Sequence, residues 1–353
     1  MAKVVRFARL KPGESRYGRG LPWLFVRFVG KEIMKKLLAT TVALISALAA
    51  ATHAQTYPTK PLRLILPYPP GGPTDIMGRT AGGILAKAWS VQVIADNRPG
   101  FNGNLGAGMC AKAPPDGYTL CTVSGAQAVA PSISSTVTFD GTRDFSHVTL
   151  LAILPMLLVV HPSLPVKTTR DLIAFAQKRP GALNYASTGV GVTPQLTMEM
   201  FKQQTGIDIV NVTYKGAMAA LVDQIAGRVE TSFSIAVGAM PFVKEGKLRA
   251  LGVSTRVRFP SLPDVPMIDE AGLKGFDASS WQGIVMPAGV PREIVEQMNS
   301  TLSVGLKAPE MRTRVLEMGG IVVGNTPDEF SAFYKAEAVK WARVAKAANV
   351  RVD

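Results

Sequence analysis

The octapeptide YPPGGPTD, from Tyr68 to Asp75, has the residue types of an anion-binding turn. It follows an apolar run and precedes apolar positions spaced three or four apart, which predicts a strand, a glycine turn and a helix capped by Thr74. Gly71 and Gly72 would let backbone N–H groups approach a ligand, and a helix N-terminus carries about half a positive charge. The competing interpretation is structural, because any tight strand-to-helix turn benefits from glycine and a threonine cap. The segment lacks the Lys and the Ser or Thr of a phosphate-binding loop, which disfavours a nucleotide.

Two further turns offer similar chemistry. The segment from Ser187 to Thr193 supplies hydroxyls and, around Gly189, backbone amides. It lacks the GxGxxG spacing and the following acidic residue of a dinucleotide site, so we interpret it as a cup for an anion. The turn at Tyr214 and Gly216 opens another predicted helix. If the chain folds into two facing lobes, the three turns converge on one cleft at the carboxyl ends of the strands.

The chain offers little for catalysis or for metal binding. His147 and His161 have no GxSxG partner, so a nucleophilic triad has no support in the sequence. Asp75 sits where helix capping explains it, and no Cys or His cluster has metal-ligand spacing. We therefore expect neither an enzyme nor a cofactor. Cys110 and Cys121 either pair in an oxidising compartment or remain two buried thiols.

The elements that must position these turns follow one pattern from Tyr57 onward. Short apolar runs alternate with helix-period segments, as in βα units around a mostly parallel sheet. Strands are predicted at 62–68, 91–95, 118–123, 154–161, 183–186, 207–214, 229–235, 248–254 and 281–286. Helices are predicted from Thr74, at 169–179, 193–206 and 217–226, and as two helices after 286, the last opened by a capping box at Thr326 and Glu329. A Gly-rich connection from Gly100 to Gly108 separates the second and third strands.

Residues 34–54 have the parts of a secretory signal peptide. Lys35 and Lys36 precede an apolar stretch at 37–51, and the small residues Thr52 and Ala54 suit cleavage after Ala54. The stretch is about five residues short of a bilayer-spanning helix, so a permanent anchor is the weaker alternative. We expect a soluble periplasmic chain from Gln55, exported by the general secretion route, and interpret residues 1–33 as an artefact upstream of a start at Met34.

Composition and charge fit an exported globular protein. The 353 residues are 47% hydrophobic and 18% charged, which excludes a disordered chain. The net charge is +14, but residues 1–54 hold ten Lys or Arg and two acidic residues, a net +8, and so leave only +6 for the rest. The basic character therefore belongs largely to the leader, and no nucleic-acid partner is expected.

Several motifs in a fixed order resemble one family over about residues 57–352. They are YPTKPLRLILPYPPGGPTDIMGR, ADNRPGFNGNLGA, APPDGYTL, VTYKG, GKLRALGVSTRVRFPSLPDVPMIDEAGLKGF and WQGIVMPAGVP. This set looks like the Bug (TctC-like) substrate-binding proteins of tripartite tricarboxylate transporters. The resemblance implies an α/β, type II periplasmic-binding-protein fold with two lobes joined by two crossing segments. It also implies a monomer that binds a small organic carboxylate and delivers it to the membrane permease subunits of the transporter.

The resemblance further implies which residues contact the ligand. In the first lobe, the ligand is held by a loop at Tyr68 to Asp75, whose amides and bridging waters bind a carboxylate, and by a second loop at Ser124. In the second lobe, it is contacted by the loop at Ser187, and we expect Tyr214 and Ser234 to contact it too. The expected contacts are Tyr68, Gly71, Gly72, Thr74, Asp75, Ser124, Ser187, Gly189, Thr193, Tyr214 and Ser234. Arg98, in the hallmark NRPG, we interpret as structural.

Two departures from the family pattern bear on the ligand. Gln195 stands where many members have His, and Ser234 stands where many have Asp. The second puts in doubt any recognition of a ligand ammonium group.

We expect lobe one to comprise 57–155 with 278–353 and lobe two 156–277. A same-fold protein that reports ligand occupancy to a partner without transport is the alternative function.

Overall fold

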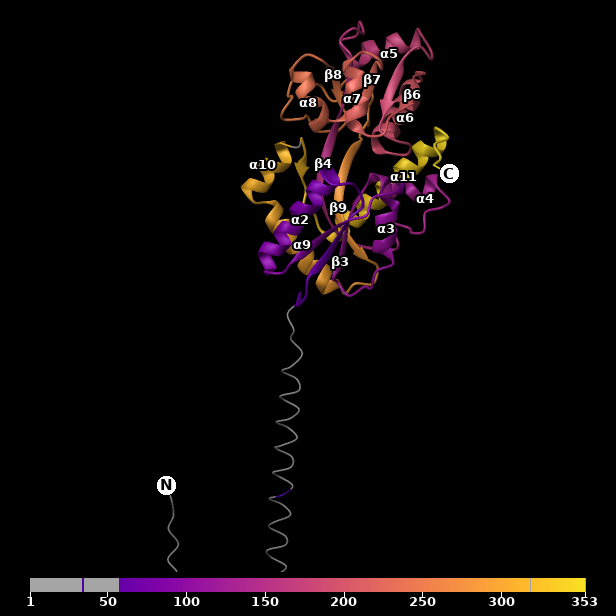
Figure 1. Cartoon of the computed structure of the whole chain (residues 1–353). Helices are drawn as coiled ribbons and strands as arrows, with labels where there is room; N and C mark the ends of the chain where they lie inside the picture. The colour runs from indigo at the N-terminus through magenta and orange to yellow at the C-terminus, as the bar shows by residue number, and fades with distance from the viewer. Residues whose placement is uncertain (1–33, 35–56, 318, 353) are drawn as a thin grey trace, which may run out of the picture. The chain divides into compact units, whose positions relative to one another are not determined.

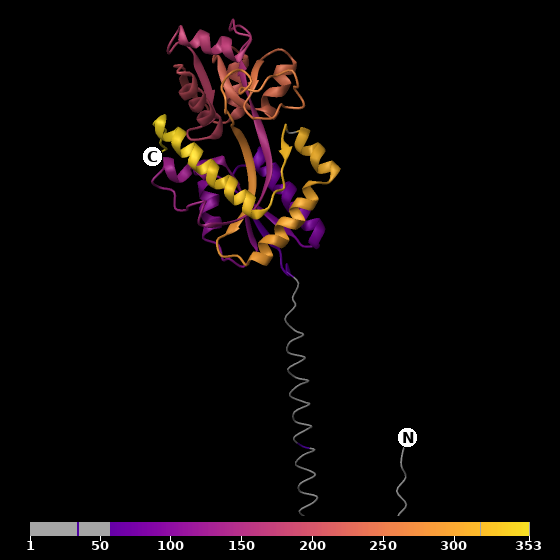
Figure 2. The same ribbon diagram turned by 180° about the vertical axis from the view of Figure 1, so that it is seen from behind.

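The structure of the chain is a computed structural model that describes residue 34, residues 57–317 and residues 319–352. The predicted signal peptide and the residues upstream of it lie outside the described residues, apart from Met34. Within these described ranges, no helix combines the length and the apolar character that crossing a bilayer requires. Residues 57–352 form the body drawn in colour in Figures 1 and 2.

The first lobe, lower in Figure 1, is built on parallel strands in the order β2-β1-β3. Strand β9 pairs antiparallel with β3, and the first half of β4 pairs antiparallel with β9. The short strand β10 pairs with β4 from outside this order. The strands are β1 (Leu62–Leu66), β2 (Val93–Asn97), β3 (Thr119–Ser124), β4 (Phe145–Val160), β9 (Ser279–Pro287) and β10 (Ile321–Val322). The helices are α2 (Pro73–Trp89), α3 (Asn104–Ala111), α4 (Gly125–Ile133), α9 (Arg292–Leu306), α10 (Pro309–Glu317) and α11 (Pro327–Ala347), with a 3-10 turn η1 (Phe101–Gly103) before α3.

The second lobe continues the same sheet. The last residues of β4 pair antiparallel with β7 and β8, and β7 continues to β5 and β6, which run parallel to it. The strands are β5 (Asn184–Ser187), β6 (Val210–Thr213), β7 (Thr231–Ile235) and β8 (Arg249–Val253), and the helices are α5 (Thr169–Gln177), α6 (Thr193–Thr205), α7 (Ala217–Ile225) and α8 (Ala236–Lys244). Strand, turn and helix alternate here as the sequence predicts.

The lobes are joined by two antiparallel strands that pair with each other. Strand β4 pairs with β9 as far as Pro155 and with β7 from Met156, and both long strands run between the lobes in Figure 1. The changeover lies close to the lobe boundaries expected from the sequence, 57–155 with 278–353 and 156–277, which themselves stay a prediction.

Side-chain alternation explains how the sheet of the first lobe is covered. Leu62, Leu64 and Leu66 of β1 point to the face covered by α2 and α9, whereas Ile65 points to the face covered by α3, α4 and α11. In the second lobe, Leu158 of β4 packs with α5 and α6, and its neighbour Leu157 packs with α7 and α8. The lobes are therefore layered sandwiches with helices on both faces, as continuous apolar strands require.

The C-terminal helix α11 packs against both lobes. Its first half places Phe330 in the first-lobe core, and its second half places Trp341 and Val344 in the second-lobe core. Gln203 of α6 donates from Nε2 to the carbonyl oxygen of Val344 at 3.0 Å. Figure 2 shows α11, in yellow, crossing from the lower lobe to the upper one.

Other local expectations can be compared with the structure directly. The capping box at Thr326 is confirmed, since Thr326 Oγ1 accepts from the backbone N–H of Glu329. The Thr74 cap is wrong, because α2 begins one residue earlier at Pro73, with Gly72 at the N-cap. Three helices, not two, follow β9. Cys110 and Cys121 are buried free thiols in the first-lobe core, and burial raises the pKa of Cys110 well above its ordinary value.

Candidate functional site

The loop between β1 and α2 presents backbone amides at its tip. Gly71 has a φ of +89°, in the region that glycine adopts without strain, whereas Gly72 has an ordinary extended φ of −79°. A Cβ added at either glycine would meet no atom within 4 Å. Gly72 has no side chain with which to cap α2, so the N–H groups of the first helical turn have no side-chain acceptor at the cap position. Sequence reasoning expected this open, amide-rich turn.

Asp75 holds this loop in place. Its carboxylate accepts from the Gly71 N–H at 3.0 Å, from Asn97 Nδ2 at 2.9 Å and from Arg79 Nε at 3.0 Å. Burial alone would raise the pKa of Asp75, but the hydrogen bonds from Asn97, Gly71 and Arg79 outweigh burial and lower it. The side chain is only 3% exposed. Asp75 is therefore ionised and fully engaged with the protein.

Asn97 is a loop-positioning residue that sequence reasoning missed. It donates from Nδ2 to Asp75 and also to the carbonyl oxygen of Tyr68 at 2.9 Å, so it ties the end of β2 to both ends of the loop. The NRPG motif that begins with Asn97 was the available signal. Its next residue, Arg98, forms an ion pair with Asp96 at 2.8 Å, which agrees with the structural role expected for Arg98.

Tyr68 and Ser124 meet in a hydrogen-bonded cluster with Gln127 and Asn102. The Tyr68 hydroxyl donates to the carbonyl oxygen of Asn102 at 2.9 Å and lies 3.2 Å from Ser124 Oγ. Gln127 accepts from the Ser124 N–H at 3.0 Å and donates from Nε2 to the Asn102 carbonyl at 2.8 Å. Burial raises the pKa of Tyr68, which keeps the phenol neutral. Two of the expected contact residues are thus brought together, and Ser124 is the N-cap of α4.

In the second lobe, the loop from Ser187 to Thr193 has the same design as the first. Gly189 and Gly191 have φ of +148° and +73°, and α6 begins at Thr193 after Val192, which has no side-chain acceptor for a cap. Gln195 accepts from the Gly191 N–H at 2.6 Å, so this departure from the family pattern serves to hold the loop. Ser187 is fully buried at the end of β5.

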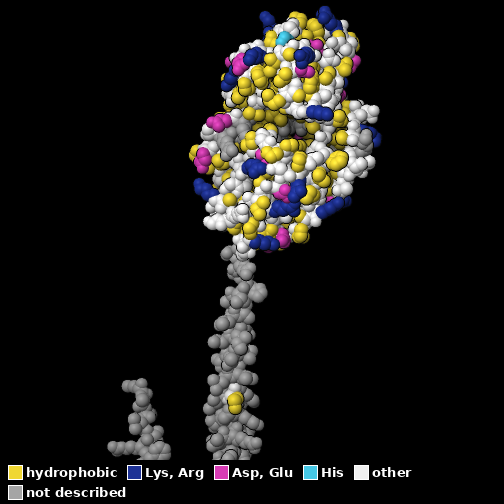
Figure 3. Space-filling view, in the orientation of Figure 1, with side chains coloured by type: hydrophobic (Ala, Val, Ile, Leu, Met, Phe, Trp, Pro, Cys, Tyr) yellow, Lys and Arg dark blue, Asp and Glu magenta, His cyan; other side chains and the backbone are white. Residues whose placement is uncertain are grey.

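The loops of the two lobes touch each other. Asn102 donates from Nδ2 to the carbonyl oxygen of Val190 at 2.8 Å, across 88 positions of sequence. A Cβ built on Gly125 would lie 3.0 Å from Thr193 Oγ1, so the first residues of α4 and α6 are close neighbours. Figure 3 shows a hollow at the level where the upper and lower lobes meet. The turn at 187–193 therefore lies against the first lobe, beside Asn102 and Gly125; convergence of the turns at 68–75 and 214–216 on the same cleft stays a prediction.

Tyr214 and Ser234 are held within the second lobe. The Tyr214 hydroxyl donates to Asp223 Oδ2 at 3.1 Å, and burial together with this carboxylate raises its pKa. Ser234 Oγ lies 2.9 Å from Ser232 Oγ on β7. Among the described residues, neither side chain is hydrogen-bonded to a residue of the first lobe. Their contact with a ligand stays a prediction.

Gln282 is a polar residue of the crossing strands that sequence reasoning missed. It lies opposite Ser124 in the β3–β9 pair, so the two side chains share one face of the sheet. Gln282 is 1% exposed, and its Oε1 atom has no hydrogen-bond partner among the described residues. An unpaired buried acceptor is costly, so this oxygen is suited to a water or a ligand hydroxyl.

A family comparison agrees with this geometry. The sequence model described as "Tripartite tricarboxylate transporter family receptor" (TctC) matches residues 77–350. The chain belongs to this family. Protein BugT of Bordetella pertussis is 31% identical over 323 residues, which cover 90% of this chain and 99% of BugT. The family consists of periplasmic solute-binding proteins rather than enzymes.

Two solved structures of the TctC type contain ligands. An R. palustris protein with adipate is 35% identical with a TM-score of 0.75, and the match covers 84% of this chain and 99% of that one. MatC from Rhodopseudomonas palustris with bound malate is 28% identical with a TM-score of 0.71, and the match covers 82% of this chain and 99% of MatC. The TctC receptor therefore has the two-lobed α/β fold of periplasmic binding proteins that its resemblance implied.

Proposed function

We propose that this TctC receptor captures a small organic carboxylate between its lobes and delivers it to the membrane permease of a tripartite transporter. The supporting observation is that helices α2 and α6, from opposite lobes, both begin at residues without a capping side chain, Gly72 and Val192. Their first N–H groups have no side-chain acceptor at the cap, and a helix N-terminus favours negative charge. Thr193, whose Oγ1 atom lies beside the first residue of α4, adds a hydroxyl between the lobes.

The ligand class follows from the lack of a free negative charge in the loops, since the carboxylate that they contain is already bonded to the protein. An ammonium group needs a carboxylate partner, but Asp75 is occupied by Gly71, Asn97 and Arg79. Ser234, where many relatives carry Asp, offers a neutral hydroxyl already within hydrogen-bond distance of Ser232. We infer a mono- or dicarboxylate with no required amino group, in keeping with adipate and malate in the related structures.

Calorimetric titration of the purified protein with adipate, malate, citrate, benzoate, aspartate and glutamate tests this class. At least one acid without an amino group should bind, and its amino analogue should bind at least tenfold more weakly. Ser124→Ala should weaken binding several-fold, since the Ser124 hydroxyl donates to Gln127 Oε1 at 2.9 Å and orders the Tyr68 cluster, and a neutral hydrogen bond contributes about 1 kcal/mol. Ser132→Ala is the matched control, because Ser132 lies on the same helix and donates to Val129 O within it. Tight binding of aspartate or glutamate alone would contradict the proposed class.

The location and the partner are tested separately. Intact-mass analysis of exported protein should give a chain that begins at Gln55 and is recovered from the periplasm. Loss of carboxylate uptake on deletion of the gene would support delivery to a permease. Unchanged uptake together with a lost transcriptional response to the same acid would favour the alternative, a receptor that signals occupancy to a partner protein.

A further inference from the structure

The outward face of α11 is exposed and basic after the first turn of the helix. Figure 2 shows this helix on the surface of the molecule, crossing from the lower lobe to the upper one. Its inward face carries the residues that pack into the cores of both lobes. Since residues three and four apart share one side of a helix, the exposed positions form a single stripe. We call it the α11 stripe, and it comprises Ala332, Lys335, Ala336, Val339, Arg343 and Lys346.

The positive charge of the α11 stripe is not compensated. Among the residues that the structure describes, Lys335, Arg343 and Lys346 form no ion pair. Lys340, at the edge of the stripe, pairs with the buried Glu337. Arg343 is three residues from both Lys340 and Lys346, and like charges at this spacing repel each other. The helix dipole favours a cation in the last turn, which explains Lys346 but not Lys335 in the first half of the helix.

Other surface helices of the chain neutralise such charges within the helix. On α9, Arg292 pairs with Glu296 at 2.7 Å, four residues on. On α6, Lys202 pairs with Glu199 at 3.3 Å, three residues before it. The α11 stripe contains no acidic residue at these spacings, so its cations remain available to carboxylates of another molecule.

The middle of the α11 stripe is formed by small and apolar side chains. Helical geometry places Ala332, Ala336 and Val339 between Lys335 on one side and Lys340 on the other, and Val339 is 62% exposed. Apolar contacts at the centre and charges at the rim are typical of a protein interface. Helices that insert into a lipid surface present Trp, Phe or Leu, which the stripe lacks. The surface therefore fits a protein segment better than a bilayer.

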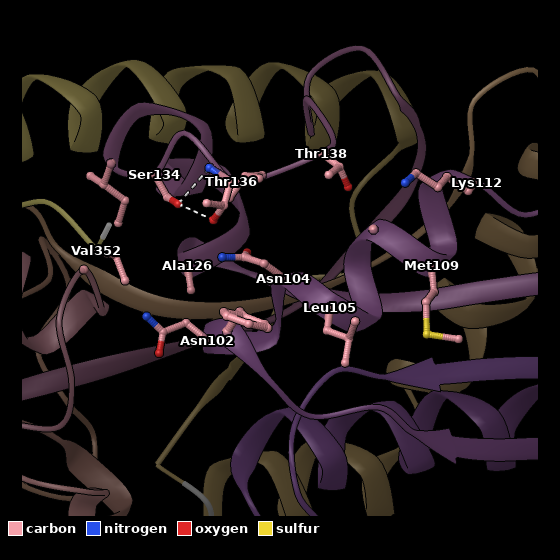
Figure 4. A pocket seen from close by; sticks show the side chains of 15 residues that line it. Asn102, Asn104, Leu105, Met109, Lys112, Ala126, Ser134, Thr136, Thr138 and Val352 are labelled. Atoms are coloured by element: carbon pink, nitrogen blue, oxygen red, sulfur yellow. Dashed lines mark hydrogen bonds between the residues drawn. The ribbon is translucent and has the colours of Figure 1, made fainter.

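The C-terminal end of α11 is fastened where the two lobes meet. The backbone N–H of Val352 donates to the carbonyl oxygen of Ile133 in the first lobe at 3.0 Å. A Cβ built on Gly191 of the second lobe would lie 3.5 Å from Val352 Cγ2. Val352 also lines the pocket of about 600 Å³ beside α3 and α4, drawn in Figure 4. A partner that lies along α11 thus rests on an element held by both lobes, which suits a permease that releases a molecule from between them.

We propose that the α11 stripe is the surface on which the membrane permease docks, through an acidic segment of the permease. This inference rests on the proposed delivery to a permease. Carboxylates of the segment pair with Lys335, Arg343 and Lys346, and its small or apolar side chains pack on Val339. The stripe lies on the outer surface of α11, so docking leaves the candidate ligand loops uncovered.

Interferometry with the permease subunits in nanodiscs of uncharged phosphatidylcholine tests the charge. The wild-type receptor should bind the permease, and raising NaCl from about 50 to about 300 mM should weaken this binding. The α11 variant should bind at least tenfold more weakly and depend less on salt. It combines Lys335→Glu, Arg343→Glu and Lys346→Glu.

A matched control variant changes the net charge equally at other places. Its three lysines are exposed, form no ion pair among the described residues, and lie in the last turn of α2 and at the C-caps of α5 and α9. They are changed together as Lys87→Glu, Lys178→Glu and Lys307→Glu. The control variant should bind the permease within twofold of the wild type. Equal affinities of the α11 variant and the control variant would overturn the proposal.

Photo-crosslinking in cells tests the location without altering a charge. The photoreactive residue p-benzoylphenylalanine introduced at Val339 should cross-link to the permease, at a segment rich in Asp and Glu by mass spectrometry. Val304 is the control, because it is 70% exposed on α9. A permease cross-link from Val304 and none from Val339 would place docking elsewhere and refute the stripe.

These measurements separate failure of the stripe from failure of the proposed function. A wild-type receptor that does not bind the permease would contradict delivery itself, and the docking surface with it. A wild type that binds the permease no better than the α11 variant refutes the stripe alone. Sedimentation with vesicles of phosphatidylglycerol and phosphatidylethanolamine tests the remaining partner. Wild-type binding to these vesicles that the α11 variant loses, with equal binding of both to the permease, would assign the stripe to lipid and overturn the proposal.

Discussion

The two glycines of the β1–α2 loop allow backbone strain and ligand contact to be separated by experiment. Gly71 has a φ of +89° and Gly72 a φ of −79°, yet both have open space where a Cβ would stand. Gly71→Ala should therefore cost about 1–2 kcal/mol of stability, the penalty of an L-residue in the left-handed region. For a domain of this size that is a fall of roughly 2–8 °C in Tm.

Gly72→Val should behave in the opposite way. Its backbone is already in a region open to every L-residue, so the Tm should stay within about 2 °C of the wild type. If the ligand carboxylate lies against the loop amides, the added side chain occupies its place. The loss of one charge-assisted hydrogen bond, about 1.5–3 kcal/mol, corresponds to roughly 10- to 150-fold weaker binding.

Thermal unfolding and calorimetry on the same preparations give both quantities. Gly246→Ala is the control for strain, because Gly246 has a φ of +71°, open space at Cβ and a position between α8 and β8. It should lower the Tm as Gly71→Ala does and leave carboxylate affinity unchanged. A Gly72→Val protein that binds its carboxylate at wild-type affinity would show that the ligand does not approach this loop.

Three other predictions address pH, the lobe contact and specificity. Burial, with a smaller effect of Lys335, lowers the pKa of His147 from its ordinary 6.5 to about 4, so the folded state prefers the neutral ring. This contribution to the free energy of unfolding should be complete above pH 6.5 and should fall by about 3 kcal/mol as the pH drops toward 4. Urea unfolding from pH 7.5 to 4.5 measures this fall, and a His147→Phe protein that shows the same fall would assign it to other groups. Asn102→Leu removes the 2.8 Å bond to Val190 and should weaken carboxylate binding about fivefold, with no change if the lobes close without this contact. Ser234→Asp should improve the affinity for aspartate or glutamate relative to their deaminated analogues; an unchanged ratio in calorimetry would remove this position from ammonium recognition.

Local signals in the sequence placed most elements but not those built around close packing. Helix α3 was missed because it overlaps the stretch predicted as a Gly-rich connection, and glycine has low helix propensity. A Cβ at Gly106 would lie 2.9 Å from the carbonyl oxygen of Arg98, so this glycine allows close approach of two backbones rather than a flexible loop. The first half of the 16-residue strand β4 was also missed, since only its continuous apolar run from Leu154 stood out.

The candidate site likewise has parts that the sequence predicts and parts that it does not. The turns at Gly71 and Gly189 could be predicted because glycine and the following helix are local signals. The contributions of Asn97 and Asn102 could not, because each depends on a partner that the fold brings near. Asn102 illustrates the reason, since it meets Val190 across 88 positions, and nothing in the FNGN segment specifies that contact.

The paired crossing strands have a mechanical consequence. Because Ile153 faces Trp281 and Pro155 faces Ser279, the connection between the lobes is a hydrogen-bonded ribbon and not a pair of free loops. Glu337 of α11 fastens this ribbon by accepting from Trp281 Nε1 at 2.9 Å and from Trp341 Nε1 at 2.8 Å. When two paired strands are bent together, their ladder of hydrogen bonds is strained, and relief of that strain returns the strands toward their unbent shape. Opening of the receptor would then be restored by the protein itself, and its amplitude would be limited by how far β4 and β9 can twist together before their ladder breaks.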